Sequence, residues 1–457
     1  MGEFKSSLQH LMAELERVDL RLRLRVHRIR QKNGQRGEDE FRGLYISEDD
    51  LDSLMADGVA TRDTAAPEDD PSLVLAQGRL EKEVARRKRG SAANGVRLRL
   101  SELADKFSLN PFEVDTLLIC LLPEVDIKYE KLFAYLHDDI TRKRPSVDLV
   151  LQCLLESLDA RLAARDAFMP GAPLTANSLV RIEEDSASRS LLARTLQIDD
   201  RVAGFLLESD RVDGRLSACA RLIRCPWEPA KMMVTDEVRS QLDRLAEMHR
   251  ISKNTFLVYF RGPAGSGRKT AAGALCREWA LPLLTVEFGA LLSADIQPEI
   301  GIRLAFREAR LQDATLCWDS IDPIFSQDNL RLCAAAFVEE IGAFDGPIFA
   351  AGEAAWQPGD VFGGRSFFSI ELDRPSSDMR KKLWESCLDG QGPGIPASGL
   401  QEIADRFRFT PAQVRDAAAA ARNCALGRGS SQISIDDLYA AIIGYLELLK
   451  VDIKDAD

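Results

Sequence analysis

The spacing of hydrophobic residues changes along the chain and divides it into segments. In residues 4–30, apolar residues recur at alternating steps of four and three, the spacing of a heptad seam, which Arg25 interrupts. The seam predicts an amphipathic or coiled-coil helix within residues 1–35, packed either on a partner or on its own domain. Residues 36–95 include the run MADGVATRDTAAPEDDPSLVL, whose Ala, Asp and Pro content indicates a flexible linker.

Residues 96–230 are predicted to be mostly helical, and the strand-like SLVRIEED at 178–185 follows the helices. Helices followed by a small hairpin are typical of a winged-helix domain. Such domains can bind DNA, but the expected recognition helix, PFEVDTLLICLL, is acidic and apolar where a basic helix would be needed. We therefore favour a protein-contact or spacer role for this domain.

Residues 231–375 alternate short apolar runs with helical segments, as in NTFLVYF followed by KTAAGALCREWA. Apolar runs bounded by Gly and Pro, each followed by a helix, predict a parallel β-sheet covered on both faces. Residues 376–457 are predicted to be helical again. The order indicates an α/β fold, a three-layer domain with a parallel sheet followed by a small helical lid.

Composition and charge narrow the function classes. The chain has 457 residues and a net charge of -12, which argues against a protein that coats nucleic acid. Its nine cysteines are scattered and form no CxxC pair, so we expect buried thiols in a reducing cytoplasm. No run of 18 apolar residues occurs, which predicts no transmembrane helix and no membrane partner.

The stretch RGPAGSGRKT, residues 261–270, follows a predicted strand and precedes a predicted helix. A phosphate-binding loop works in this context, because its backbone N–H groups and the helix N-terminus point at phosphate oxygens. The glycines stand where such a turn needs them, but the lysine comes one place late. In the pattern GxxxxGK[ST], Arg268 takes the lysine position and Lys269 takes the Ser/Thr position.

This shift changes what the loop is expected to do. A shift of one residue turns a helical side chain by about 100°, so we expect Lys269 to point away from the phosphates and Thr270 to be displaced. Arg268 can still neutralise phosphate. The predicted nucleotide-binding residues are Gly262, Pro263, Ala264, Gly265, Ser266, Gly267, Arg268, Lys269, Thr270 and Arg415.

Acidic residues follow two of the predicted strands. In ATLCWDSIDPIF, Asp319 ends an apolar run and is the expected Mg²⁺ ligand, with Thr270 as the second metal residue. Ser320 stands where many ATPases carry a glutamate that orients the attacking water. Asp322 and Glu353 are the further catalytic candidates, and we hypothesise that Glu353 partly replaces the missing acid.

Two arginines complete the predicted site. Arg365 precedes the last strand, at the position from which a subunit offers an arginine finger to its neighbour's γ-phosphate. Arg415 lies near the start of a lid helix and fits a second sensor of bound nucleotide.

The order GPAGSGRKT, LCWDSID, FAAGE, GGRSFFSIELDRP and FTPAQVRDAA resembles the AAA+ ATPases. NPFEVDTLLICLLPEVDIKYEKLFAYLHDDITRKRPSVDLVL, with SLLARTLQIDDRVAGFLLESDRVD after it, resembles a narrower family. That family is the AAA+ ATPase of bacterial (extracellular) contractile injection systems, the phage-tail-like particles, with an N-terminal winged-helix region. The resemblance covers roughly residues 95–450, and FRGLYISEDDLDSLM at 41–55 also fits it.

The resemblance implies a P-loop fold, ATP with Mg²⁺, and a ring-forming homo-oligomer for which a hexamer is one candidate. It also implies partners among the injection-system components and a role in assembling the particle. Arg268, Lys269 and Ser320 depart from the family pattern and put hydrolysis in doubt, though not binding. GALLSADIQP lacks the aromatic pore loop of an unfoldase, so protein unfolding is not supported.

Our main interpretation is an ATP-binding assembly chaperone of a contractile injection system with weak ATPase activity. One alternative is a degenerate pseudo-ATPase scaffold that binds partners through its N-terminal regions. Another is a DNA-associated AAA+ loader, but those commonly carry the winged helix after the lid, and this chain is acidic.

Overall fold

The computed structural model forms two compact units, Met1–Arg211 and Val212–Asp457, which we describe separately. The structure describes residues 2–34, 69–183, 190–224, 232–252, 255–327, 330–356, 365–388 and 395–448. The sequence 41–55, most of the predicted linker and Cys225 lie outside these residues.

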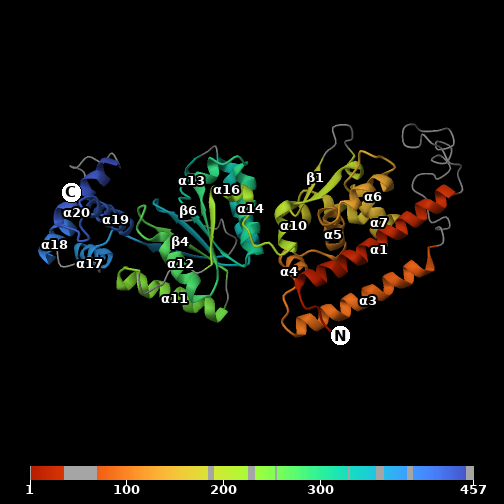
Figure 1. Cartoon of the computed structure of the whole chain (residues 1–457), viewed down its shortest axis with the longest axis horizontal. Helices are drawn as coiled ribbons and strands as arrows, with labels where there is room; N and C mark the ends of the chain where they lie inside the picture. Colours follow the sequence, from red (N-terminus) through yellow and green to blue (C-terminus); the bar gives the residue numbers. More distant parts are fainter. Residues whose placement is uncertain are drawn as a thin grey trace. The chain divides into compact units, whose positions relative to one another are not determined.

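The first unit begins with a long helix that packs on its own unit. In α1 (Ser7–Gly34) the seam residues Leu11, Leu15, Val18 and Leu22 are buried. The helix contacts α3 (Pro71–Ala93) and α5 (Pro111–Val125), and α1 and α3 lie side by side in Figure 1. Arg17 on α1 pairs with Asp115 on α5. The seam is therefore used within the unit, and residues 71–93 of the range expected to be a linker form a helix.

The rest of the unit is helical with one small hairpin. α5 starts with a capping box, in which the side chains of Asn110 and Glu113 each accept the other's backbone N–H. β1 (Val180–Glu183) pairs antiparallel with β2 (Thr195–Ile198). The other α-helices are α4 (Arg99–Lys106), α6 (Lys128–His137), α7 (Val147–Leu154), α8 (Leu158–Ala164), α9 (Pro173–Ala176) and α10 (Asp200–Leu206).

The second unit is built on a six-stranded sheet with the order β3-β5-β6-β7-β4-β8. The strands are β3 (Ala220–Ile223), β4 (Phe256–Arg261), β5 (Leu283–Glu287), β6 (Thr315–Asp319), β7 (Ile348–Gly352) and β8 (Ser366–Glu371). β4 to β8 are parallel, which confirms the predicted fold class, and β3 adds an antiparallel edge beside β5. β3 belongs to the range 96–230, where we expected only the winged-helix region.

Helices cover both faces of the sheet because the strand side chains alternate between two cores. On β4, Phe256, Val258 and Phe260 pack in the core with α11 (Asp236–Ser252) and α12 (Arg268–Glu278). Leu257 and Tyr259 belong to the opposite core, with α14 (Pro298–Leu311) and α16 (Arg331–Ala343). Two short helices, α13 (Phe288–Leu292) and α15 (Pro323–Ser326), follow β5 and β6.

The helices after the sheet have a core of their own. They are α17 (Ser377–Leu388), α18 (Ala397–Arg406), α19 (Pro411–Gly427) and α20 (Ile435–Leu448). Trp384, Ile403 and Leu438 are fully buried within this cluster. The predicted helical lid therefore forms as a separate small bundle at the end of the unit.

The cysteines of the described residues are thiols, as the scattered spacing of cysteines in the sequence predicted. All eight cysteines in the described part of the chain are free, and burial raises the pKa of Cys276 to about 12. Among the described residues, no helix is long and apolar enough to cross a membrane.

A buried ion pair fixes the segment before β3 to the sheet domain. The Arg307 guanidinium on α14 lies 2.6 Å from the Asp213 carboxylate, and both side chains are almost completely buried. Burial alone would raise the pKa of Asp213, but hydrogen bonds from Arg215 and the charge of Arg307 keep it below its ordinary value of 3.8. Removing one member of such a buried pair is strongly destabilising, because the other charge then stays unpaired in an apolar environment.

We expect Asp213→Ala to lower the free energy of unfolding of this unit by about 3 kcal/mol. Because the pKa of Asp213 is depressed in the folded state, its contribution is present at neutral pH and is lost as the pH falls below 3.8. Urea unfolding followed by tryptophan fluorescence measures this, since all five tryptophans lie in Val212–Asp457. As a control, Glu247→Ala breaks the exposed pair with Arg250 and should cost less than about 0.5 kcal/mol. Equal effects of the two variants would contradict this account.

Candidate functional site

The Gly-rich loop joins β4 to α12 at the carboxyl end of the sheet, between the neighbouring strands β7 and β8. The Gly262 N–H donates to Gly352 O at 3.0 Å, and a Cβ on Gly262 would lie 2.2 Å from Leu372 O. Gly267 precedes α12 with a φ of 106°, and no side chain caps the helix there. The first N–H groups of α12 are therefore aimed at the loop, as phosphate binding requires.

The lid helix α19 begins directly against this loop. The Ala412 N–H donates to Gly265 O at 3.1 Å, and a Cβ on Gly265 would lie 2.6 Å from Thr410 Oγ1. Gly265 has a φ of 82°, so a larger residue would be both strained and blocked. Thr410 caps α19 and Gln413 completes the capping box. The lid and the loop are thus held together by backbone contacts, which nothing in the sequence pattern indicated.

Arg268 lies under the loop and bridges its first residue to the end of β6. Its guanidinium donates to Gly262 O at 3.0 Å and lies 3.2 Å from Asp319 Oδ1. The residue is only 7% exposed. In this arrangement Arg268 places positive charge beneath the phosphate cradle.

Lys269 also faces Asp319, a partner that the sequence did not indicate. Its Nζ lies 2.9 Å from Asp319 Oδ2, while Asp319 Oδ1 accepts the Ser320 N–H at 3.0 Å. Lys269 occupies the sequence position of the usual Ser/Thr, and a side chain at that position faces the acid at the end of β6. Both carboxylate oxygens of Asp319 therefore have partners within the chain.

Asp322 holds the segment that follows β7. Its two oxygens accept N–H groups from Glu353 at 2.9 Å and Ala354 at 3.1 Å, and the Tyr259 hydroxyl at 3.1 Å. A Cβ on Gly352 would lie 2.3 Å from both Asp322 Oδ1 and the Tyr259 hydroxyl, so this approach needs glycine. Burial and the neighbouring carboxylate raise the pKa of Tyr259.

Glu353 contacts the phosphate loop itself. Its Oε1 accepts the Ala264 N–H at 2.9 Å, and the residue is exposed. Tyr259, Asp322 and Glu353 thus form a path of hydrogen bonds from β4 to the loop. Tyr259 was not among the predicted site residues, although it carries the one hydroxyl in the otherwise apolar FLVYF.

Family models match both ends of the chain. A model described as winged helix domain, variant, matches residues 1–220, and one described as contractile injection system ATPase helical domain matches residues 376–441. The chain therefore carries an N-terminal winged-helix domain, and its C-terminal helices match the helical domain of contractile injection system ATPases. The resemblance and the winged-helix region found in the sequence are therefore confirmed.

Solved structures with a similar fold include one described as "Structural Basis for Katanin Self-Assembly". It has a TM-score of 0.39 and 21% identity, over 47% of this chain and 83% of that one. A second, "Crystal structure of FIGL-1 AAA domain", has a TM-score of 0.40 and 15% identity, over 51% of this chain and 89% of that one. No curated protein matches the chain significantly.

The Gly-rich loop fits a phosphate group. Its glycines form the turn, Arg268 and Lys269 supply charge, and α12 begins beneath it. The Ser266 hydroxyl is buried next to Gly262 and has no hydrogen-bond partner among the described residues. A buried hydroxyl without a partner is costly, and a phosphate oxygen would satisfy it.

The same residues do not fit Mg²⁺. Magnesium prefers oxygen ligands in octahedral geometry, but Asp319 is already bound to two cationic side chains. Thr270 is the next residue of α12 after Lys269 and contributes no contact to Asp319 among the interactions of the described residues. Nor do the described residues hold any group of three or more His, Cys, Asp or Glu that could bind a metal.

The two further arginines lie at different places in the second unit. Arg415 is exposed on α19, one turn after Thr410 and Ala412, which contact the loop. Arg365 precedes β8 and donates to Gly346 O at 3.0 Å and to Phe344 O. Because β8 runs parallel to β4, Arg365 lies at the amino end of the strands, roughly 20 Å from the chain's own loop at their carboxyl end. Burial lowers the pKa of Arg365.

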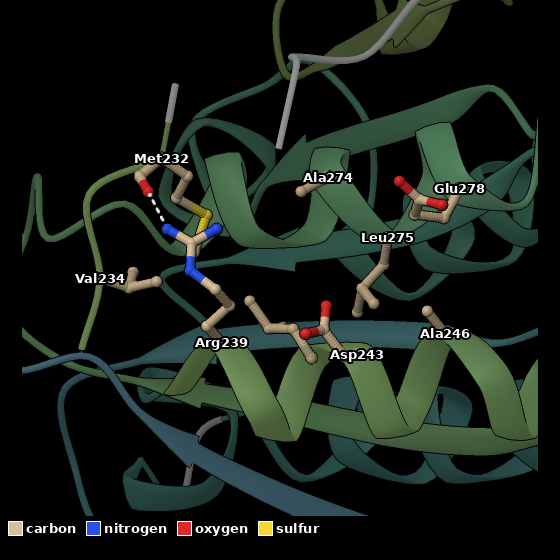
Figure 2. A pocket seen from close by; sticks show the side chains of 9 residues that line it. Met232, Val234, Arg239, Asp243, Ala246, Ala274, Leu275 and Glu278 are labelled. Carbon is tan, nitrogen blue, oxygen red and sulfur yellow. Dashed lines mark hydrogen bonds between the residues drawn. The ribbon is translucent and has the colours of Figure 1, made fainter. Parts of the chain in front are cut away.

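A small cavity between α11 and α12 is not part of this site. It measures about 50 Å³, and Figure 2 shows that Met232, Leu275 and Glu278 are among the residues around it. Arg239 closes one side by donating to Met232 O at 3.1 Å. None of the predicted site residues lines this cavity.

Proposed function

We propose that the chain binds ATP at residues 262–268 and acts as an assembly factor, or chaperone, of a phage-tail-like contractile injection system. The observation that supports the proposal is the Gly-rich loop, with three glycines at positive φ, a helix N-terminus and the lid seated on the loop. A ring-forming homo-oligomer in the cytoplasm, with a hexamer as one candidate, completes the proposal. Its partners are then other subunits and components of the injection particle, with no role for membrane or nucleic acid.

The proposed roles divide between backbone and side chains. The N–H groups of Gly265, Gly267 and the first turn of α12 bind the phosphates, and Arg268 neutralises them from below. Arg415 reaches them from the lid. Arg365, roughly 20 Å from its own loop, serves the site of a neighbouring subunit.

Hydrolysis is proposed to be slow. Ser320 cannot act as a base, and the oxygens of Asp322 are occupied by the segment after β7. Glu353 is exposed beside the loop and keeps one oxygen outside its bond to Ala264. It is therefore the acid that we propose for orienting the attacking water.

A pseudo-ATPase scaffold is the second candidate. The pairing of Asp319 with both Arg268 and Lys269 favours it, because the carboxylate that would serve the chemistry is neutralised within the chain. In that case the nucleotide only stabilises the fold, and the N-terminal unit provides the binding to partners.

ATP binding and turnover distinguish these candidates. We expect the wild-type chain to bind a fluorescent ATP analogue and Arg268→Ala to raise the Kd about tenfold, because a charge-assisted contact to phosphate is lost. Asp319→Ala should retain binding, and both variants should lose turnover. Arg250→Ala, on the exposed end of α11, is the control. Binding without turnover in the wild type supports the scaffold, and no binding at all contradicts ATP binding by either candidate.

Glu353→Gln separates chemistry from structure. Glutamine keeps an oxygen that accepts the Ala264 N–H but loses the carboxylate charge, so turnover should fall about 100-fold while the melting temperature stays unchanged. Glu371→Gln changes an exposed carboxylate at the end of β8, paired with Arg261, and serves as the control. Normal turnover in Glu353→Gln would refute the proposed role.

Mixing two inactive variants tests whether Arg365 acts on a neighbour. Asp319→Ala subunits keep the arginine but lack a working site, and Arg365→Ala subunits have the reverse defect. We expect each variant alone to lose turnover by about 1,000-fold and the mixture to regain part of it. If the mixture stays inactive although the two variants co-assemble, Arg365 does not act across subunits.

A further inference from the structure

We infer that the Lys269 ammonium replaces Mg²⁺ at this loop, so that the chain binds ATP without a divalent cation. This inference rests on the proposed ATP binding and names the form of the ligand. It starts from the disagreement between the usual metal partner of such loops and the residues present here.

The ammonium stands at the place that a metal ion would need. In the usual pattern, a Ser/Thr hydroxyl and the acid at the end of the strand hold the metal between them. Here the first position is Lys269, whose Nζ lies 2.9 Å from Asp319 Oδ2. An ammonium contact therefore takes the place of the hydroxyl–metal–carboxylate arrangement.

The exposure of the pair leaves the ammonium accessible to a ligand. The Lys269 side chain is 48% exposed, whereas the Asp319 side chain is 9% exposed. An ammonium has three N–H donors, and the contact with Asp319 occupies only one side of it. The remaining donors can bind phosphate oxygens above the loop while Asp319 keeps the ammonium in position.

The charge balance favours phosphate over a divalent cation. Asp319 contributes one negative charge, and Arg268 and Lys269 contribute one positive charge each. The three groups together carry a net positive charge, which attracts phosphate and repels Mg²⁺ at short range. The nearby Ser266 hydroxyl is buried and has no partner in the part of the chain that the structure describes, so it adds a donor for an oxygen of the ligand.

The experiment measures the Kd of a fluorescent ATP analogue with Mg²⁺ and then with excess EDTA. We expect the wild-type Kd to differ by less than about threefold between the two conditions, because the positive charges belong to the chain. Weaker binding in EDTA by more than that overturns the inference and leaves the proposed ATP binding intact. No binding in either condition, with an unchanged melting curve, instead overturns the proposed ATP binding.

Variants at residue 269 identify the group responsible. Lys269→Thr supplies the usual hydroxyl and removes the ammonium, so EDTA should weaken its binding at least about tenfold. Lys269→Arg keeps a cation and should remain insensitive to EDTA. Lys382→Thr makes the same change at an exposed lysine on α17 and should behave as the wild type. If Lys269→Thr is as insensitive to EDTA as the wild type, the ammonium is not the replacement and the inference fails.

Discussion

The contact of Asp319 with Arg268 and Lys269 organises the candidate site. One buried carboxylate at the end of β6 holds two cations from the first turn of α12. The arrangement keeps the charges of α12 directed toward the phosphate loop and takes up the acid that would otherwise bind a metal. Hydrolysis of a bound nucleotide would need the Asp319 carboxylate to take part in the chemistry, and its contacts with Arg268 and Lys269 compete with that role.

A second set of contacts supports the loop from the other side. Tyr259 and Asp322 fix the segment after β7, and Glu353 in that segment binds the Ala264 N–H. The start of α19 presses on Gly265. The loop is thus linked to two neighbouring strands and to the lid. A ligand that moves the loop would therefore also move the start of α19, through its backbone contact with Gly265.

The family matches concern the two ends of the chain, whereas the geometry of the loop concerns the chemistry of the site between them. The matches show a winged helix domain at residues 1–220 and similarity to the helical domain of contractile injection system ATPases at residues 376–441. The residues of the loop address the chemistry: Arg268, Lys269 and Ser320 differ from the usual pattern at the three positions where charge, metal and water are handled. These departures affect the groups needed for hydrolysis more than the loop backbone that binds a nucleotide.

The sequence by itself determined the elements whose signal is local. The parallel sheet, the lid and the strand–loop–helix context of residues 261–270 follow from apolar runs, glycines and helical periodicity, which depend on near neighbours in the chain. The seam of α1 was equally visible, but its burial against α3 and α5 was not, because a seam does not identify its partner. The edge strand β3 was also missed, since four residues carry too little pattern to separate a strand from a loop.

Only the tertiary structure decided which side chains meet at the site. The sequence places Lys269 and Asp319 fifty residues apart, and Glu353 and Ala264 still farther. Their contacts arise because β4, β6 and β7 end at the same edge of the sheet, which brings the residues after each strand together. The direction of Lys269 illustrates the difference. Helical periodicity predicts on which side of α12 the side chain lies, but only the position of β6 shows that this side faces the Asp319 carboxylate.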